Sequence, residues 1–224
     1  MNTLLINHTT RAIVQGITGK VGQAQTHWML KAGTPLVAGV TPGRGGQVIE
    51  GLPVYDTVAE AVQEQGANAS VIFVPAPFAR DAAFEAIEAG LTLVVIVTEH
   101  IPMRDTMEIK ARARWSHTRV IGPNCPGIFI PGAGKLGIMP ESIFRKGNIG
   151  VVGRSATLSY EVIANLSDGS ARGTLFSARS TGGYHTTAGW PASVPAEMAD
   201  AWRSAPAAST AWASATPSSS PAIG

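Results

Sequence analysis

A glycine-rich turn is the first segment whose residue types and spacing are suited to chemistry. Residues 16–22 read GITGKVG, so the three glycines are spaced G-x-x-G-x-x-G, not G-x-G-x-x-G as in most dinucleotide sites. Small residues let the backbone approach a ligand, and a helix N-terminus offers N–H groups to a phosphate. We predict a nucleotide phosphate site here, with a structural turn as the alternative. The residues assigned to it are Thr18, Gly19, Lys20 and Val21.

A loop with a guanidinium group follows the next expected strand. A classical NAD site needs a carboxylate about 20 positions after the glycines, which holds the ribose hydroxyls. Here residues 39–42 read GVTP, and Arg44 follows within GRGG. Because Arg can bind a phosphate through two hydrogen bonds, a ligand with an extra ribose phosphate, such as CoA or NADP, fits better than NAD. The alternative is that Arg44 is a solvated turn residue.

Two further segments lie where an expected strand ends or an expected helix begins. Val97, Thr98 and Glu99 follow an apolar run, and ligands of open α/β sheets gather at such carboxyl ends of strands. Ser155 and Thr157 are placed to cap a helix whose free N–H groups can take a phosphoryl group. The alternatives are a helix-entry role for Glu99 and simple capping without a ligand.

Prolines mark two corners of the chain. The prolines of residues 72–78 (IFVPAPF) predict a non-helical turn at the same carboxyl edge of the sheet, where ligands gather. The prolines of residues 122–127 (GPNCPG) specify a rigid corner. Cys125 within the second corner is expected to be a packed thiol, because no His–Asp partnership can be read from the sequence. The five histidines lack the spacing of metal ligands, so no metal site is expected.

Short apolar runs alternate with amphipathic segments of about a dozen residues. This alternation implies βαβ units and therefore an α/β fold with a doubly wound parallel sheet. Residues 122–146 are rich in turn formers and are expected to cross between two domains. The expected strands are 11–18, 36–40, 70–74, 91–97, 119–121 and 148–153, and the expected helices are 21–32, 57–65, 78–89, 103–114 and 155–166.

Composition narrows the class of protein. With 45% apolar residues among 224, the chain can bury a core, which excludes wholesale disorder. A net charge of +2 argues against a nucleic-acid coat, and no apolar run reaches the ~18–20 residues that span a membrane. Residues 1–10 do not read as a signal peptide, and a single cysteine fits a reducing compartment. We expect a soluble, cytoplasmic protein without nucleic-acid or membrane partners.

The alternating pattern stops near residue 166. Of the 58 residues from 167 to 224, 42 are Ala, Ser, Thr, Gly or Pro. Such a stretch buries too little apolar area to offset ~1–2 kcal/mol of backbone entropy per residue. We interpret it as a low-complexity tail that is disordered or results from a reading-frame change, the alternative being a genuine flexible extension. The expected domains are therefore 1–122, 123–166 and the tail, 167–224.

Together and in this order, these segments resemble the alpha subunit of succinyl-CoA synthetase, or succinate–CoA ligase. The resemblance covers about residues 5–166 and implies a Rossmann-like CoA-binding domain followed by an incomplete flavodoxin-like ligase domain. Its most specific parts are 39–46 (GVTPGRGG), 71–78 (VIFVPAPF), 98–102 (TEHIP), 121–127 (IGPNCPG), 137–140 (GIMP) and 154–161 (RSATLSYE).

The resemblance also implies a reaction and assigns roles to residues. CoA would contact residues 18–21, Arg44 and residues 97–99, and Tyr160 would contact the acid substrate. The helix opened by Ser155 would steady a phosphohistidine during the interconversion of succinate plus CoA with succinyl-CoA. ATP or GTP with Mg would be bound by a partner beta subunit, in a heterodimer or heterotetramer.

Some positions depart from the family pattern. Arg44 stands where the family usually has Lys, and Gly153 and Ala156 replace the first Ser and the Gly of its S-R-S-G-T-L motif. The phosphorylated histidine is not identifiable, and His185 lies in the wrong setting, so no catalytic residue is assigned. We expect this chain alone to be inactive. The alternatives are a non-catalytic CoA-binding module, an alpha subunit for another acid such as malate, and an NADP-dependent reductase.

Overall fold

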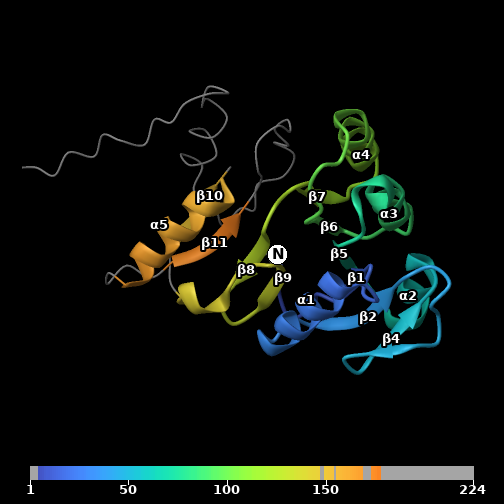
Figure 1. Ribbon diagram of the computed structural model, residues 1–224, viewed down its shortest axis with the longest axis horizontal. Helices are drawn as coiled ribbons and strands as arrows, with labels where there is room; N and C mark the ends of the chain where they lie inside the picture. Colours follow the sequence, from blue (N-terminus) through green and yellow to red (C-terminus); the bar gives the residue numbers. More distant parts are fainter. Residues whose placement is uncertain (1–4, 147–148, 154, 169–172, 178–224) are drawn as a thin grey trace, which may run out of the picture.

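The computed structural model describes residues 5–146, 149–153, 155–168 and 173–177 of the chain. These residues form two adjoining sheets (Figure 1). The first has seven strands in the order β3-β4-β2-β1-β5-β6-β7, and the second has four in the order β10-β11-β8-β9. Among the described helices, none is long and apolar enough to cross a membrane.

The first sheet is parallel except at one edge. Every pair from β4 through β2, β1, β5 and β6 to β7 is parallel, and only β3 runs antiparallel to its neighbour. This confirms the predicted doubly wound parallel sheet. Its strands are β1 (Ala12–Gln15), β2 (Leu36–Val40), β3 (Val48–Ile49), β4 (Leu52–Tyr55), β5 (Ala69–Ile72), β6 (Leu93–Ile96) and β7 (Arg119–Ile121), and its helices are α1 (Lys20–Lys31), α2 (Val58–Gln65), α3 (Ala76–Glu88) and α4 (Met103–Trp115).

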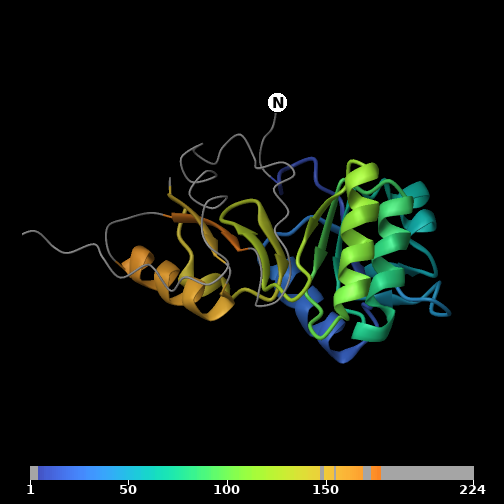
Figure 2. The ribbon, with the colours of Figure 1, turned by 90° about the horizontal axis from the view of Figure 1, so that it is seen from above.

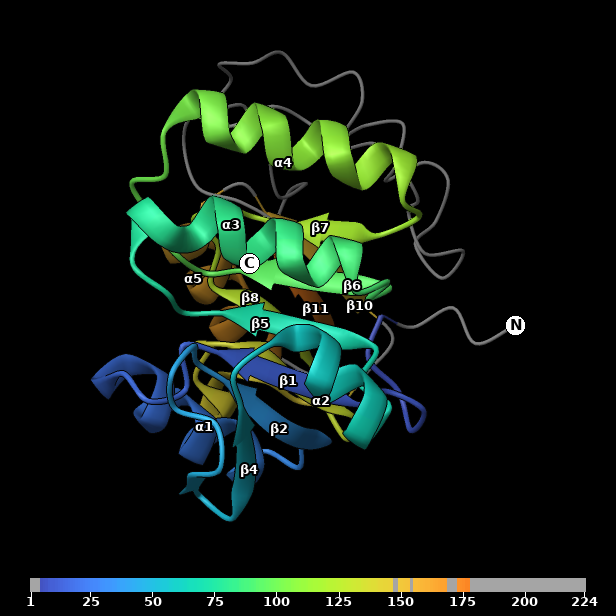
Figure 3. The ribbon, with the colours of Figure 1, turned by 90° about the vertical axis from the view of Figure 1, so that its right-hand side faces the viewer.

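Both faces of the first sheet are buried, which explains the near-continuous apolar runs in its central strands. Successive side chains of a strand point to opposite faces, so Ile13 and Val14 belong to different apolar cores. Ile13 packs with residues of α2, α3 and α4, which lie in front of the sheet in Figure 3. Val14 packs with residues of α1, β8 and β9 on the other face (Figure 2).

The second sheet lies beyond α1 and contains both antiparallel and parallel pairs. The pairs β8–β9 and β8–β11 are antiparallel, whereas β10–β11 is parallel. A smaller apolar cluster that includes Phe129, Met139, Phe144 and Ile163 joins the sheet to α5. The elements are β8 (Gly127–Ile130), β9 (Gly134–Gly137), the 3₁₀ turn η1 (Glu141–Ile143), β10 (Ile149–Gly153), α5 (Ala156–Asp168) and β11 (Gly173–Ser177).

The structure corrects three expectations about the elements. Residues 122–146 contain the β8–β9 hairpin and η1, not only a crossing, and the short hairpin β3–β4 was not expected. Helix α3 begins at Ala76, so Pro77 lies in its first turn, where a missing N–H costs nothing, and not in a non-helical turn.

The segment 167–224 also contains an element that its composition does not predict. Residues 173–177 form β11, whose main chain pairs with β10 on one side and β8 on the other. Main-chain hydrogen bonds do not depend on side-chain type, which is why composition gave no signal for this strand. Residues 178–224, where most of the expected tail falls, lie outside the described residues.

Candidate functional site

The candidate site lies at the carboxyl ends of four adjacent parallel strands, β2, β1, β5 and β6. At the first corner, between β1 and α1, the Gly16 N–H donates to the Val40 carbonyl at 2.8 Å, and the Gly19 N–H donates to the Gly16 carbonyl at 3.1 Å. Gly19 is the N-cap of α1, and no side chain caps this end of the helix. The first-turn N–H groups of α1 are therefore left without a side-chain acceptor, as an anion site requires.

Two glycines are required at the first corner for steric reasons. Gly16 has φ +83°, a left-handed conformation that side chains disfavour. A Cβ on Gly22 would lie 2.1 Å from the Gly16 carbonyl oxygen, so only glycine lets α1 pack this closely against the turn. The G-x-x-G-x-x-G spacing thus has a structural purpose, and it also exposes the neighbouring Lys20 and Val21.

The Arg44 loop leaves the second corner, beside the first. The Thr18 hydroxyl donates to the Thr41 hydroxyl at 3.3 Å, which joins the glycine turn to the end of β2. The Arg44 N–H then donates to the Thr41 carbonyl at 3.1 Å. The Arg44 side chain is exposed, and its guanidinium pairs with no carboxylate in the described part of the chain. The structure thus brings the Thr18 turn and the base of the Arg44 loop together, with a free cationic group nearby.

Thr98 connects the corners that follow β5 and β6. Its hydroxyl donates to the Val74 carbonyl at 2.7 Å, and its own carbonyl accepts the Asn124 N–H at 2.9 Å. Val74 in turn lies against Gly16, since a Cβ on Gly16 would be 3.2 Å from the Val74 nitrogen. The predicted residue Glu99 is exposed beside Thr98. Residues 97–99 therefore lie on the same edge of the sheet as the glycine turn.

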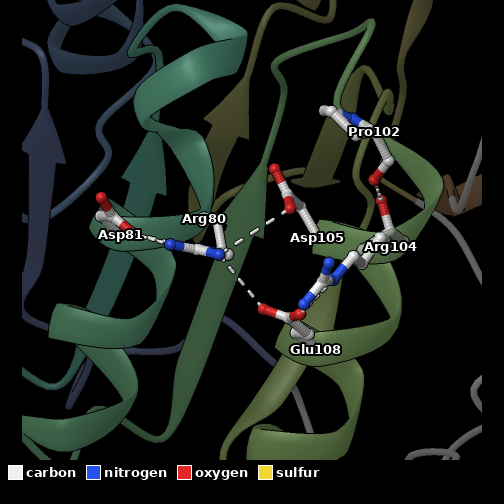
Figure 4. Close-up of polar contacts among 7 residues, drawn as sticks. Arg80, Asp81, Pro102, Arg104, Asp105 and Glu108 are labelled. Atoms are coloured by element: carbon white, nitrogen blue, oxygen red, sulfur yellow. Dashed lines mark hydrogen bonds and ion pairs between the residues drawn. The ribbon is translucent and has the colours of Figure 1, made fainter.

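A cluster of charges ties together the two helices that begin after these corners (Figure 4). Arg80 of α3 lies 3.3 Å from Glu108 and 4.0 Å from Asp105, both on α4. Arg104, in the first turn of α4, also contacts Glu108, at 3.0 Å. These ion pairs join the N-terminal halves of α3 and α4.

Cys125 is a packed thiol, as expected. Its side chain is buried, and its Sγ donates to the Ile96 carbonyl at 3.2 Å. Burial raises the pKa of this thiol to about 12, although a hydrogen bond from the Gly127 main chain acts in the opposite direction. The thiol is thus protonated at neutral pH and is not a nucleophile.

Tyr160 of α5 lies near this cysteine corner. Burial is the main cause of its raised pKa, and the charge that Cys125 would carry as a thiolate adds to it. Its phenol is therefore protonated at neutral pH and is a potential hydrogen-bond donor. Tyr160 also packs against the apolar cluster that joins α5 to the second sheet.

Ser155, and not Thr157, caps α5. The Ser155 hydroxyl accepts the Leu158 N–H at 3.3 Å, whereas the exposed Thr157 side chain makes no hydrogen bond within the described residues. The Ser159 hydroxyl donates to the Ser155 carbonyl at 2.6 Å. A Cβ on Gly153 would lie 2.0 Å from the Ser159 hydroxyl, so glycine at this position makes room for that hydrogen bond.

Sequence reasoning did not single out four residues that shape the site: Thr41, Asp56, Val74 and Asn124. Thr41, Val74 and Asn124 lie within segments that the sequence analysis named, whereas the signal for Asp56 is its place directly before the capping pair Thr57 and Glu60 at the start of α2. Within the described ranges no group of His, Cys, Asp or Glu could hold a metal ion. His185 lies outside those ranges.

The fold and the corners define the class of protein. A family model described as "CoA binding domain" matches residues 7–100, which include β1 to β6 and the corners at residues 16–22, 41–46 and 97–99. The class is thus that of Rossmann-like CoA-binding domains.

Curated relatives narrow this class further. The chain is 57% identical over 165 residues to the alpha subunit of ADP-forming succinate–CoA ligase from Methanothermobacter thermautotrophicus. This alignment covers 74% of this chain and 56% of the relative. The Aquifex aeolicus alpha subunit is 52% identical over 165 residues, 73% of this chain and 54% of the relative. The matched part of the chain is homologous to succinate–CoA ligase alpha subunits, and the chain spans about half the length of these relatives.

Solved structures share the fold. One is ATP citrate lyase from Methanothrix soehngenii in complex with citrate and coenzyme A, with a TM-score of 0.65 and 24% sequence identity. The match covers 80% of this chain and 32% of the lyase chain. A dinucleotide-forming acetyl-coenzyme A synthetase from Ca. Korarchaeum cryptofilum matches 82% of this chain and 41% of its own, with a TM-score of 0.66 and 19% identity. At these identities the likeness concerns the fold alone.

Proposed function

We propose that this chain binds CoA at the carboxyl edge of its first sheet, as part of a succinate–CoA ligase alpha subunit. The observation that carries the proposal is the meeting of the Thr18 turn, the Arg44 loop and Thr98 at one edge, beside a helix N-terminus without a capping side chain. The diphosphate of CoA would accept hydrogen bonds from the N–H groups of residues 19–21. The Arg44 guanidinium would pair with the phosphate on the ribose, and residues 97–99 would line the path of the pantetheine arm.

Residues of α5, which packs on the second sheet, would bind the acid substrate and stabilise the phosphoryl group. CoA, when bound, supplies the thiol that becomes the thioester. The Tyr160 hydroxyl, protonated at neutral pH, would donate to a carboxylate of succinate. The N-terminus of α5, with Ser155 and Thr157, would stabilise a phosphoryl group through its partial positive charge. We assign no catalytic histidine.

The relatives' names also suggest a larger assembly. We propose a beta subunit that binds ATP or GTP with Mg, in a heterodimer or heterotetramer located in the cytoplasm. A single, buried cysteine is consistent with such a reducing compartment. In this assembly residues 1–122 would form the CoA-binding domain and residues 123–166 the beginning of the ligase domain.

Calorimetric titration of the full chain with CoA tests the binding proposal. Arg44→Glu should weaken CoA binding at least about tenfold, because it places a negative charge beside a phosphate. Arg114→Glu, the same change at an exposed arginine of α4, is the matched control and should leave the dissociation constant unchanged. No CoA binding by the parent chain would refute the proposal, and NADPH binding without CoA binding would favour a reductase. An unchanged constant for Arg44→Glu would reject the role of that residue.

Reconstitution with a succinate–CoA ligase beta subunit tests the catalytic part. The assay supplies nucleotide, Mg and CoA with either succinate or malate, and it measures thioester formation and phosphorylation of this chain. A preference for malate would assign the chain to a related acid–CoA ligase. CoA binding without phosphorylation or thioester formation would make it a non-catalytic CoA-binding module.

A further inference from the structure

Besides main-chain bonds such as those from Arg44 to Thr41 and from Gly46 to Val54, the Arg44 loop is held by one side-chain carboxylate. Asp56 follows β4, and its Oδ1 accepts hydrogen bonds from the N–H groups of both Arg44 and Gly45, each at 2.9 Å. These are charge-assisted bonds to the main chain, so they act on the path of the loop and not on the guanidinium. The positive charge of Arg44 therefore remains available to a ligand.

The start of α2 holds Asp56 in place. The Asp56 N–H donates to a carboxylate oxygen of Glu60 at 3.1 Å, and the Glu60 N–H donates to the Thr57 hydroxyl at 3.2 Å. Residues 56–60 thus form a rigid N-terminal cap. Through this cap the position of the Arg44 loop is tied to a helix that packs on the first sheet.

Gly45 provides the space that this arrangement needs. A Cβ on Gly45 would lie 2.6 Å from Oδ2 of Asp56, whereas a Cβ on the neighbouring Gly43 or Gly46 would meet nothing within 4 Å. A side chain at residue 45 would therefore displace the Asp56 carboxylate.

We propose that Asp56 is a positioning residue, which holds the Arg44 loop so that the guanidinium reaches the ribose phosphate of CoA. This inference rests on the proposed function, and Asp56 itself would not touch the ligand. A carboxylate near an anion site opposes anion binding by its charge, so its favourable effect must come from the loop geometry. If the loop geometry matters, the neutral and nearly isosteric Asn should preserve CoA binding and the truncated Ala should weaken it. If only the charge of Asp56 mattered, both substitutions would strengthen CoA binding, because both remove a negative charge.

The test compares CoA with dephospho-CoA, which lacks the ribose phosphate, by calorimetric titration of the full chain. We expect the parent chain to prefer CoA by about tenfold, the contribution of one charged phosphate contact. Asp56→Ala should reduce this preference to about twofold or less while dephospho-CoA affinity stays the same. Asp56→Asn, which keeps an acceptor for both N–H groups, should retain most of the preference. Gly45→Ala should act like Asp56→Ala, because its methyl group displaces the carboxylate.

Glu64→Ala is the control, since it removes an exposed acidic charge from the same helix. It should leave the preference unchanged. The inference is overturned if Asp56→Ala and Gly45→Ala both keep the tenfold preference, or if Asp56→Asn loses it as fully as Asp56→Ala. Should Asp56→Ala fail to fold, Gly45→Ala decides the question alone. A parent chain that binds no CoA contradicts the proposed function instead, and a parent chain without a preference contradicts the role of Arg44.

Discussion

At the scale of single residues, environment decides which polar groups are available for chemistry. Cys125 lies in a rigid corner at the edge of the site, yet its buried thiol donates to the Ile96 carbonyl and stays protonated. Arg44 is the opposite case: its main chain is fixed by Asp56 and its side chain is free. The residue types suggested a packed thiol at position 125, whereas the role proposed for Asp56 depends on hydrogen bonds with residues 11 and 12 positions away.

The Cys125 environment predicts a pH dependence of stability. The native thiol has a pKa of about 12, above the value of about 8.5 for an unfolded cysteine. As the pH rises from about 9 to 12, the unfolded state therefore loses its proton first. The free energy of unfolding should fall by up to roughly 1.4 kcal/mol per pH unit in this window. Urea titrations across this range should show a steeper decline for the parent chain than for Cys125→Ala, and parallel declines would contradict the buried thiol.

At the scale of elements, the N-terminus of α1 lies at the candidate site, and the segment after its C-terminus is hydrogen-bonded to the second sheet. Thr34 follows α1, and its hydroxyl donates to the Lys135 carbonyl at 2.8 Å and accepts the Lys135 N–H at 2.9 Å. Lys135 lies in β9, where burial lowers the pKa of its ammonium group, which donates to the Met139 carbonyl at 2.9 Å. The β8–β9 hairpin therefore clamps the helix whose N-terminus faces the proposed phosphate.

Thr34→Val should loosen this clamp. Valine has a similar shape but leaves the N–H and carbonyl of Lys135 without their partner in a buried position, which costs about 1–3 kcal/mol. For a chain of this size the melting temperature should fall by about 2–4 °C for each kcal/mol. Thermal melts measured by circular dichroism check this expectation. Thr157→Val, at an exposed threonine, is the control; an equal shift in both variants would argue against the clamp.

The elements differ in how well local sequence predicted them. The helices were expected from their apolar period of 3.6 residues, and the central strands from short apolar runs, because burial on both faces removes alternation. The β8–β9 hairpin was not expected, because glycines interrupt its apolar residues and favour the prediction of a turn. Those glycines allow close approach of the two strands: a Cβ on Gly127 would lie 2.0 Å from the Leu136 carbonyl oxygen.

At the scale of the whole molecule, the two sheets share one apolar core. Val14 and Val71 of the first sheet pack in the same cluster as Ile128 and Leu136 of the second. The second sheet in turn depends on β11, which lies between β10 and β8. Residues beyond the expected break near 166 thus contribute main-chain pairing to the fold.

Two truncations test the contribution of β11. A chain that ends at residue 177 retains β11, whereas a chain that ends at residue 168 leaves β10 and β8 without their common neighbour. We expect the longer chain to melt several degrees higher, at about 2–4 °C for each kcal/mol of lost pairing. Differential scanning calorimetry of the two chains makes the comparison. Equal melting temperatures would show that the strand adds nothing to stability.

The amino-acid sequence by itself determined the alternation of strands and helices, the glycine turn before α1 and the cap of α5, because these depend on periodicity and sterics within a few residues. Tertiary structure alone decided that Thr18 meets Thr41, that Thr98 meets Val74 and that Asp56 holds the Arg44 loop. Such contacts follow from strand order and from packing between distant segments. No short window of sequence encodes them, because the partners become neighbours only when the sheet assembles.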